Sequence, residues 1–176
     1  HTIGDCIDLV TSAGLKFQTL LRKGPYYPHE LVNPPNKLYP MINSLPEPQI
    51  WGAMERVCTQ NACHFFIATH ADRPEKSYTI DFSEQAYRDY VPLYRHFCGL
   101  RGGELYRPDW SMVLSEAALP FVQQVDGRRS IGQITDAVAM AGSGRRAETA
   151  EIADFARRLF RGLWRLDFLA MALPGA

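Results

Sequence analysis

The chain has 176 residues, of which 46% are hydrophobic and 22% charged, and its formal net charge at pH 7 is zero. This length allows one well-formed core or two small domains. The zero net charge argues against a protein that coats nucleic acid or an anionic membrane, and no apolar run has the length of a membrane span. The chain begins at His1, and we interpret it as a piece of a longer protein.

The four cysteines are too few for a disulfide-based fold, and we expect them to be reduced in a cytoplasmic protein. Cys58, Cys63, His64 and His70 lie close together in the sequence and raise the question of zinc. Their spacing matches no common zinc module, and neighbouring residues of a strand point to opposite faces. We therefore expect no metal site.

The first elements are a helix and a strand. Thr2 and Asp5 have the spacing of a capping box, which predicts a helix over Thr2–Ala13. Gly14 follows where a helix needs a left-handed residue to end. Apolar and polar residues then alternate in Leu15–Leu21, which predicts a half-buried strand.

Residues 25–49 contain seven of the twelve prolines, which predicts an ordered but extended, turn-rich loop. Ser44 and Glu47 have the spacing of a second capping box and predict that a helix begins there. The residues expected on its apolar face are Ile50, Trp51, Met54, Val57 and Cys58.

The run Cys63–His70 is apolar at both alternating sets of positions. Phe65 and Ile67 would face one side of a sheet, and Phe66 and Ala68 the other. This pattern is typical of a strand that lies inside a sheet with helices packed on both faces.

Two stretches of the first half carry a resemblance: they read HTIGDCIDLVTSAGLKFQTLLRKGPYYPHEL and NACHFFIATHADRPEKSYTIDF. They resemble the end of the catalytic domain in a group of bacterial class I S-adenosylmethionine-dependent methyltransferases that carry an extra C-terminal regulatory region. The resemblance implies that Leu15–Leu21 is the sixth strand of that sheet and His64–His70 its antiparallel seventh strand. It also implies S-adenosylmethionine as the cofactor of the full-length parent.

The cofactor-binding part of that family is not in this sequence. The glycine pairs Gly102-Gly103 and Gly142/Gly144 do not follow a buried strand and open a helix, as a nucleotide-type turn requires. We therefore expect no cofactor in this chain and no catalysis by it alone, with the methyltransferase activity residing in the parent.

The second half begins with short elements. The alternation of apolar and polar residues predicts a strand over Tyr78–Phe82. Ser83 is expected to cap a helical turn that ends before Pro92. Arg95–Leu100 and Glu104–Arg107 suggest a hairpin around a Gly-Gly turn.

Three helices and a strand follow the hairpin. Ser115 and Ser130 are predicted caps of the first two helices, Ile152–Leu163 has a helical apolar stripe, and Leu166–Met171 is a predicted strand. A hairpin, three helices and a terminal strand are typical of a winged-helix-like domain. The predicted fold is thus α+β, with an αβ segment over residues 1–76 and a winged-helix-like domain over 77–176.

Two stretches of the second half read WSMVLSEAALPFVQQVDGRRSIGQITDAV and FARRLFRGLWRLDFLAM. They are similar to the leader-peptide recognition elements of enzymes that modify ribosomally made peptides. The similarity implies a module that binds a protein or peptide by strand addition. We expect Tyr106, Phe155 and Leu159 to line its groove, between the hairpin and the third helix.

Nucleic-acid binding is the alternative for this half. Eight arginines lie between positions 128 and 165, but seven acidic residues follow Ser111. The predicted recognition helix Ile131–Met140 contains no Arg or Lys, although base contacts require such donors. A DNA-binding or transcription-regulatory module is therefore the second hypothesis, and we do not expect nucleic acid as a partner.

The first half offers one candidate site, the loop with Lys23, Tyr26, Tyr27 and His29. If the preceding strand is parallel to its neighbours, this loop leaves the edge where open α/β sheets bind ligands and lies on the substrate side. The alternative is a packing loop whose tyrosines cover the sheet.

No catalytic constellation is apparent, and we interpret His64 and His70 as histidines satisfied at the edge of the core. An unpaired edge of the seventh-strand equivalent would favour a homodimer, unless the proline-rich loop covers it.

Overall fold

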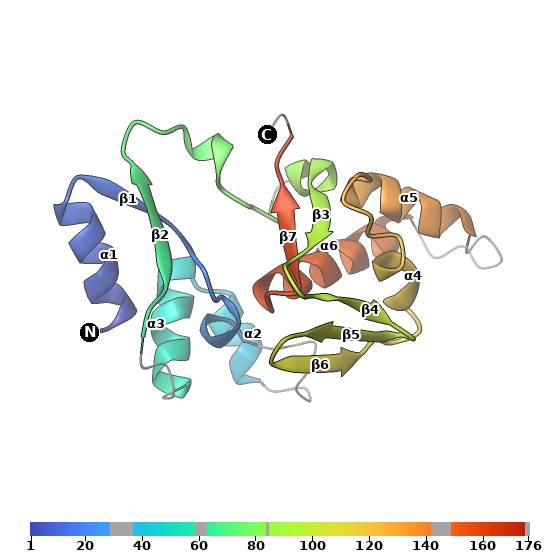
Figure 1. Cartoon of the computed structure of the whole chain (residues 1–176), viewed down its shortest axis with the longest axis horizontal. Helices are drawn as coiled ribbons and strands as arrows, with labels where there is room; N and C mark the ends of the chain where they lie inside the picture. Colours follow the sequence, from blue (N-terminus) through green and yellow to red (C-terminus); the bar gives the residue numbers. More distant parts are fainter. Residues whose placement is uncertain (29–36, 59–62, 84, 142–148, 175–176) are drawn as a thin grey trace. The chain divides into compact units, whose positions relative to one another are not determined.

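The computed structural model describes residues 1–28, 37–58, 63–83, 85–141 and 149–174. The chain divides into two compact units, His1–Thr79 and Ile80–Ala176, whereas the sequence placed the boundary at 76/77. The fold is mixed α+β with small antiparallel sheets (Figure 1). No helix in the described part of the chain combines the length and apolar character that crossing a bilayer requires.

The first unit opens with the predicted helix and strand. Helix α1 spans Ile3–Ser12, and both hydrogen bonds of the capping box between Thr2 and Asp5 are formed. Gly14 has a φ of 73°, which a residue with a Cβ atom rarely adopts. Strand β1 (Leu15–Leu20) follows directly, so the predictions for this stretch are confirmed.

The proline-rich region is more helical than predicted. It contains the 3₁₀ turn η1 (Gly24–Tyr26) and helix α2 (Leu38–Asn43). Part of the predicted loop, residues 29–36, lies outside the described residues.

The predicted capping box of the next helix is wrong. Helix α3 spans Glu47–Val57, but its N-cap is Pro46, which makes no side-chain cap. The Ser44 hydroxyl instead donates to the carbonyl of Met41 and closes α2. Val57 is 50% exposed, so the apolar face of α3 is narrower than predicted.

Strand β2 (Phe66–His70) pairs antiparallel with β1. Phe66 lies opposite Leu20, and its ring stacks on that of Phe17. These residues face the core that α1 and α3 build, whose buried members are Ile3, Leu20, Tyr26, Tyr27, Ile42, Ile50, Trp51 and Met54.

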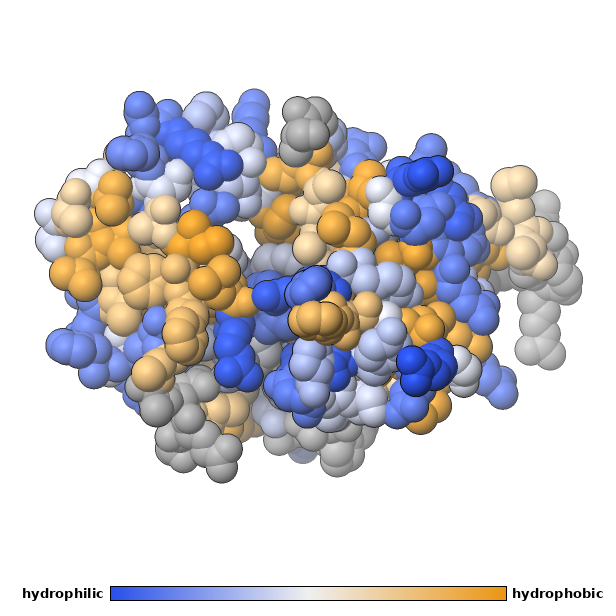
Figure 2. Space-filling model, viewed as in Figure 1, coloured by the Kyte–Doolittle hydropathy of each residue, from blue (hydrophilic) through white to orange (hydrophobic). Residues whose placement is uncertain are grey.

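Among the described residues the other face of this sheet is mostly exposed, although Thr69 on it is buried, which corrects the prediction of a strand buried on both faces. Phe65 is 52% exposed, Ile67 37% and Leu21 44%. Figure 2 shows hydrophobic side chains gathered over α1 and β2. Because α1 and α3 contact each other and share one apolar core, both cover the same face of the sheet.

The linking segment contains the 3₁₀ turn η2 (Glu75–Ser77). No strand forms over 78–82, where alternation predicted one. The alternation reflects packing instead, because Phe82 is buried against the rings of Tyr87, Tyr90 and Trp164.

The second unit contains two antiparallel sheets. The 3₁₀ turn η3 (Gln85–Asp89) leads into β3 (Val91–Tyr94), which pairs with the terminal strand β7 (Leu169–Ala172). The predicted terminal strand thus exists, shifted along the chain, but it pairs with β3 and not with the hairpin.

The predicted hairpin supplies two strands of a three-stranded sheet. Strands β4 (Gly99–Arg101), β5 (Glu104–Arg107) and β6 (Trp110–Val113) follow one another in the order β4-β5-β6. Gly102 and Gly103 both have positive φ, 58° and 87°, as a tight two-residue turn requires.

The three helices of this unit are α4 (Leu119–Val122), α5 (Ile131–Ala141) and α6 (Thr149–Arg165). The capping box at the start of α5 is confirmed, because Ser130 and Gln133 each accept a hydrogen bond from the other's backbone amide. The first helix is shorter than predicted. The side chains with 0% exposure in this core are Leu105, Val122, Ile131, Ile134, Ala156, Phe160, Leu163, Phe168 and Leu169.

Candidate functional site

The loop that we considered as a substrate-side site is part of the first unit's core. Lys23 is 7% exposed, Tyr26 3% and Tyr27 1%. The Tyr27 hydroxyl donates to Glu47 Oε1 at 2.9 Å. His29 lies outside the described residues. These side chains are enclosed in this conformation, so the structure favours the alternative of a packing loop.

Tyr26 belongs to a network of hydrogen bonds that the sequence did not predict. Its hydroxyl lies 2.5 Å from His64 Nδ1, and His64 Nε2 lies 3.1 Å from Glu55 Oε1 and 2.9 Å from the carbonyl of His1. Glu55 also accepts the amide of Ile3 with both oxygens, at 3.1 and 3.2 Å. This network joins η1, α1 and α3 to the residues before β2. We call it the His64 clamp.

The proton positions in the His64 clamp follow from its partners. Nε2 faces two oxygen acceptors, so it carries a hydrogen in the neutral ring, and Nδ1 then accepts from the Tyr26 hydroxyl. Burial, with the nearby Glu55 and Cys6, raises the pKa of Tyr26 to about 12. The phenol is therefore a neutral donor at ordinary pH. The His64 clamp fastens the unit together, and His64 is a satisfied histidine at the edge of the core, as predicted.

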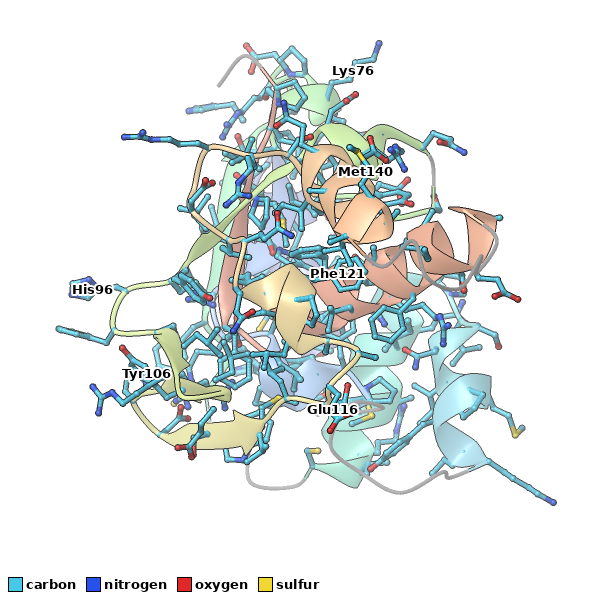
Figure 3. All side chains as sticks on the ribbon, turned by 90° about the vertical axis from the view of Figure 1, so that its right-hand side faces the viewer. Lys76, His96, Tyr106, Glu116, Phe121 and Met140 are labelled. Carbon is cyan, nitrogen blue, oxygen red and sulfur yellow. The ribbon has the colours of Figure 1, made fainter. Side chains whose placement is uncertain are left out.

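The three residues expected to line a peptide groove do not share a surface. Leu159 is 3% exposed and belongs to the core, and the ring of Phe155 packs on that of Phe121 at 5.5 Å. Tyr106 shares a sheet face with Gly99, where a Cβ atom would lie 2.6 Å from its hydroxyl. Figure 3 shows Tyr106 away from Phe121, which lies among the helices.

Strand addition at Tyr106 is also impossible for a topological reason. Tyr106 lies in β5, and β5 pairs with β4 on one side and with β6 on the other. Both rows of its backbone groups are therefore in use. An added strand needs an edge strand, so within the predicted hairpin it could pair with β4 but not with β5.

The two edge strands of this sheet are β4 and β6, and β6 carries apolar residues next to the core. Leu114 donates its amide to the carbonyl of Gly103 on the β5 side. Since backbone groups alternate in direction along an antiparallel strand, Met112 also points to β5, and Ser111 and Val113 point away from it. Among the described residues no strand pairs with that outer side. We call this row of backbone groups the β6 edge.

The side chains of β6 divide between the two faces of the sheet. Met112 lies opposite Leu105, which is fully buried, and both Trp110 and Met112 pack against the core. Ser111 is exposed on the other face, and so is Val113, whose side chain is 79% exposed. A strand added here would find apolar neighbours on one face and open space on the other.

Trp110 is held in place by its neighbours. Its ring lies 5.3 Å from that of Phe168, and the Arg107 guanidinium lies over both rings. Arg107 also donates to the carbonyl of Leu166 and pairs with Asp109. The start of β6 is therefore fixed to the end of α6.

Sequence reasoning missed β6 itself. The turn residues Pro108-Asp109, followed by the alternating Trp110-Ser111-Met112-Val113, were the signal that could have found it.

Helix α5 presents few groups to a nucleic acid. Its first turn is covered, because Ile131 donates its amide to Tyr90 and Gly132 packs so close to Arg88 that a Cβ atom would lie 3.1 Å from that residue's carbonyl oxygen. The outward side chains are Gln133, Asp136 and Met140, and Asp136 pairs with Arg88 at 2.9 Å.

Within the described residues, no group of three or more His, Cys, Asp or Glu side chains is arranged to hold a metal ion. A comparison with models of known protein families finds no family that matches this chain.

Proposed function

We propose that this chain is a non-catalytic C-terminal region of an S-adenosylmethionine-dependent methyltransferase and that its second unit binds an extended protein or peptide segment, thereby regulating the enzyme or presenting its substrate. The observation that carries the binding proposal is the β6 edge. Its outward backbone groups at Ser111 and Val113 offer hydrogen bonds to a strand, and Trp110 and Met112 supply an apolar side.

The first unit supports the methyltransferase part of the proposal. In its described residues, the two-stranded sheet has helices on one face, while Phe65, Ile67 and Leu21 are exposed on the other. Such a sheet suits the rim of a larger one, in which further strands would continue from the outer edge of β2 and further helices would cover the open face. A second copy pairing at the same edge would instead give a homodimer.

The DNA-binding hypothesis has less support. A winged helix places donors from its recognition helix in the major groove. In α5 the outward residues bring one carboxylate, Asp136, and no cation, and the first turn is occupied by η3.

We predict that Val113→Pro weakens peptide binding by about five-fold or more while the fold is retained. The Val113 amide points away from β5, so proline removes a donor that the sheet does not use, and an added strand loses one hydrogen bond and meets the proline ring. Anisotropy of a short fluorescein-labelled peptide of alternating valine and lysine, titrated with the whole chain, measures the effect.

Val113→Thr is the matched control, because it keeps the amide and a β-branched side chain, and it should bind like the native chain. The same titration with random duplex DNA at two salt concentrations tests the second hypothesis. Tight duplex binding that weakens steeply with salt, together with no peptide binding, would replace the proposal with a nucleic-acid function.

A further inference from the structure

We infer that the segment bound at the β6 edge is cationic and carries a lysine or arginine opposite Ser111. This inference rests on the proposed function and names the chemistry of its partner. It comes from the placement of three carboxylates along β6, those of Glu104, Asp109 and Glu116.

Glu104 is the carboxylate best placed for the partner. It lies on β5 opposite Val113, but its side chain leans across β6, because the Ser111 hydroxyl donates to its Oε1 at 2.5 Å. The carboxylate is thus held above the edge strand, on the solvent face of the sheet. A residue that pairs with Ser111 from an added strand projects to the same face, about 5 Å further out, and a long basic side chain reaches that oxygen.

The two other carboxylates flank the strand. Asp109 precedes β6, and Glu116 follows it on the segment that leads to α4 (Figure 3). Among the described residues neither Glu104 nor Glu116 forms an ion pair.

A nearby arginine neutralises Asp109, which leaves the charges of Glu104 and Glu116. Arg107 pairs with Asp109 and turns to the core side, where it covers Trp110. Arg101 lies on β4 directly opposite Glu104, but its guanidinium is over the ring of Tyr106 and, among the described residues, it forms no ion pair with Glu104. The outer side of β6 therefore carries negative charge.

The two faces together define an alternating pattern. On the core face, an added strand runs beside Trp110 and Met112, which favours apolar side chains. On the solvent face it runs beside Ser111 and the Glu104 carboxylate, which favours basic ones. The expected ligand is therefore a segment in which apolar and basic residues alternate, bound antiparallel or parallel to β6.

The test compares three short fluorescein-labelled peptides of equal length, in which valine alternates with lysine, threonine or glutamate. With the whole chain, we expect the lysine peptide to bind about three- to ten-fold more tightly than the glutamate peptide, in the range of exposed charge pairs. Glu104→Gln should lower that ratio by about half or more, and adding Glu116→Gln should bring it close to one. Glu151→Gln, an exposed carboxylate on α6, is the matched control and should leave the ratio unchanged.

The outcomes separate this inference from the proposed function. Equal binding of all three peptides, weakened by Val113→Pro but unaffected by Glu104→Gln, would overturn the cationic inference and leave strand addition standing. Preference for the glutamate peptide would overturn it as well. Failure of all three peptides to bind would contradict the proposed function itself.

Discussion

Truncation of Phe160 to alanine is expected to lower the free energy of unfolding of the second unit by about 3–5 kcal/mol. Phe160 is fully buried in the middle of α6, within the core that joins this helix to α4, α5 and the strands. Alanine would remove most of the side chain and leave a cavity whose walls are other core residues. A small domain is stable by only about 5–15 kcal/mol. This one change should therefore remove a large part of the second unit's stability and shift its unfolding to a lower denaturant concentration.

Chemical denaturation of the whole chain, followed by residue-resolved amide signals, measures the effect on each unit. The first unit has a separate core, so its transition should stay in place. Arg158→Ala on the same helix is the control, because that side chain is 64% exposed and pairs with Asp154 on the surface of the helix. A loss below about 1 kcal/mol for Phe160→Ala would contradict the assigned core.

Replacement of Glu55 by alanine is expected to lower the stability of the first unit by about 2–3 kcal/mol. Glu55 accepts the amide of Ile3 at the start of α1 and lies 3.1 Å from His64 Nε2. Its side chain is 18% exposed and that of His64 8%, so solvent replaces the lost acceptor only in part. Alanine therefore leaves the amide of Ile3 without this acceptor and removes one of the two acceptors of His64 Nε2, of which the carbonyl of His1 remains.

Two variants calibrate this prediction. Glu75→Ala removes a carboxylate that is 72% exposed and lies 4.0 Å from Lys16, and it should change stability by less than about 0.5 kcal/mol. Tyr26→Phe removes only the hydroxyl at His64 Nδ1 and should cost about 1 kcal/mol. Equal stability of the Glu55→Ala and Glu75→Ala variants would show that the His64 clamp does not hold the unit together.

The sequence predicted the start of a helix correctly where no neighbouring element competed for the residues of the capping box. Thr2 with Asp5 and Ser130 with Gln133 form the expected boxes. Ser44 with Glu47 has the same spacing, yet Pro46 takes the cap position and Ser44 closes the preceding helix. The competing helix α2 was hidden because its residues lie among prolines, which favoured an extended loop.

The faces of strands were harder to predict, because alternation does not say what covers each face. Phe65 and Ile67 are as apolar as Phe66, but in the described chain only the side of Phe66 has helices against it. Tyr78–Phe82 alternates without being a strand, since Phe82 packs on the rings of Tyr87 in η3 and Trp164 in α6.

Locating the candidate peptide site requires the order of the strands in the sheet, and no local sequence pattern gives that order. Tyr106 and Leu159 were reasonable choices by residue type, yet one lies in the central strand and the other in the core. In the structure β5 is paired on both sides, which makes Trp110–Val113 an edge strand.

Amide hydrogen exchange at β6 tests strand addition most directly. We expect the alternating valine–lysine peptide to protect the amides of Ser111 and Val113, which point away from β5. The amide of Leu114, already bonded to Gly103, should change little and serves as the control within the same strand. Binding of the peptide without protection at Ser111 and Val113 would contradict the account.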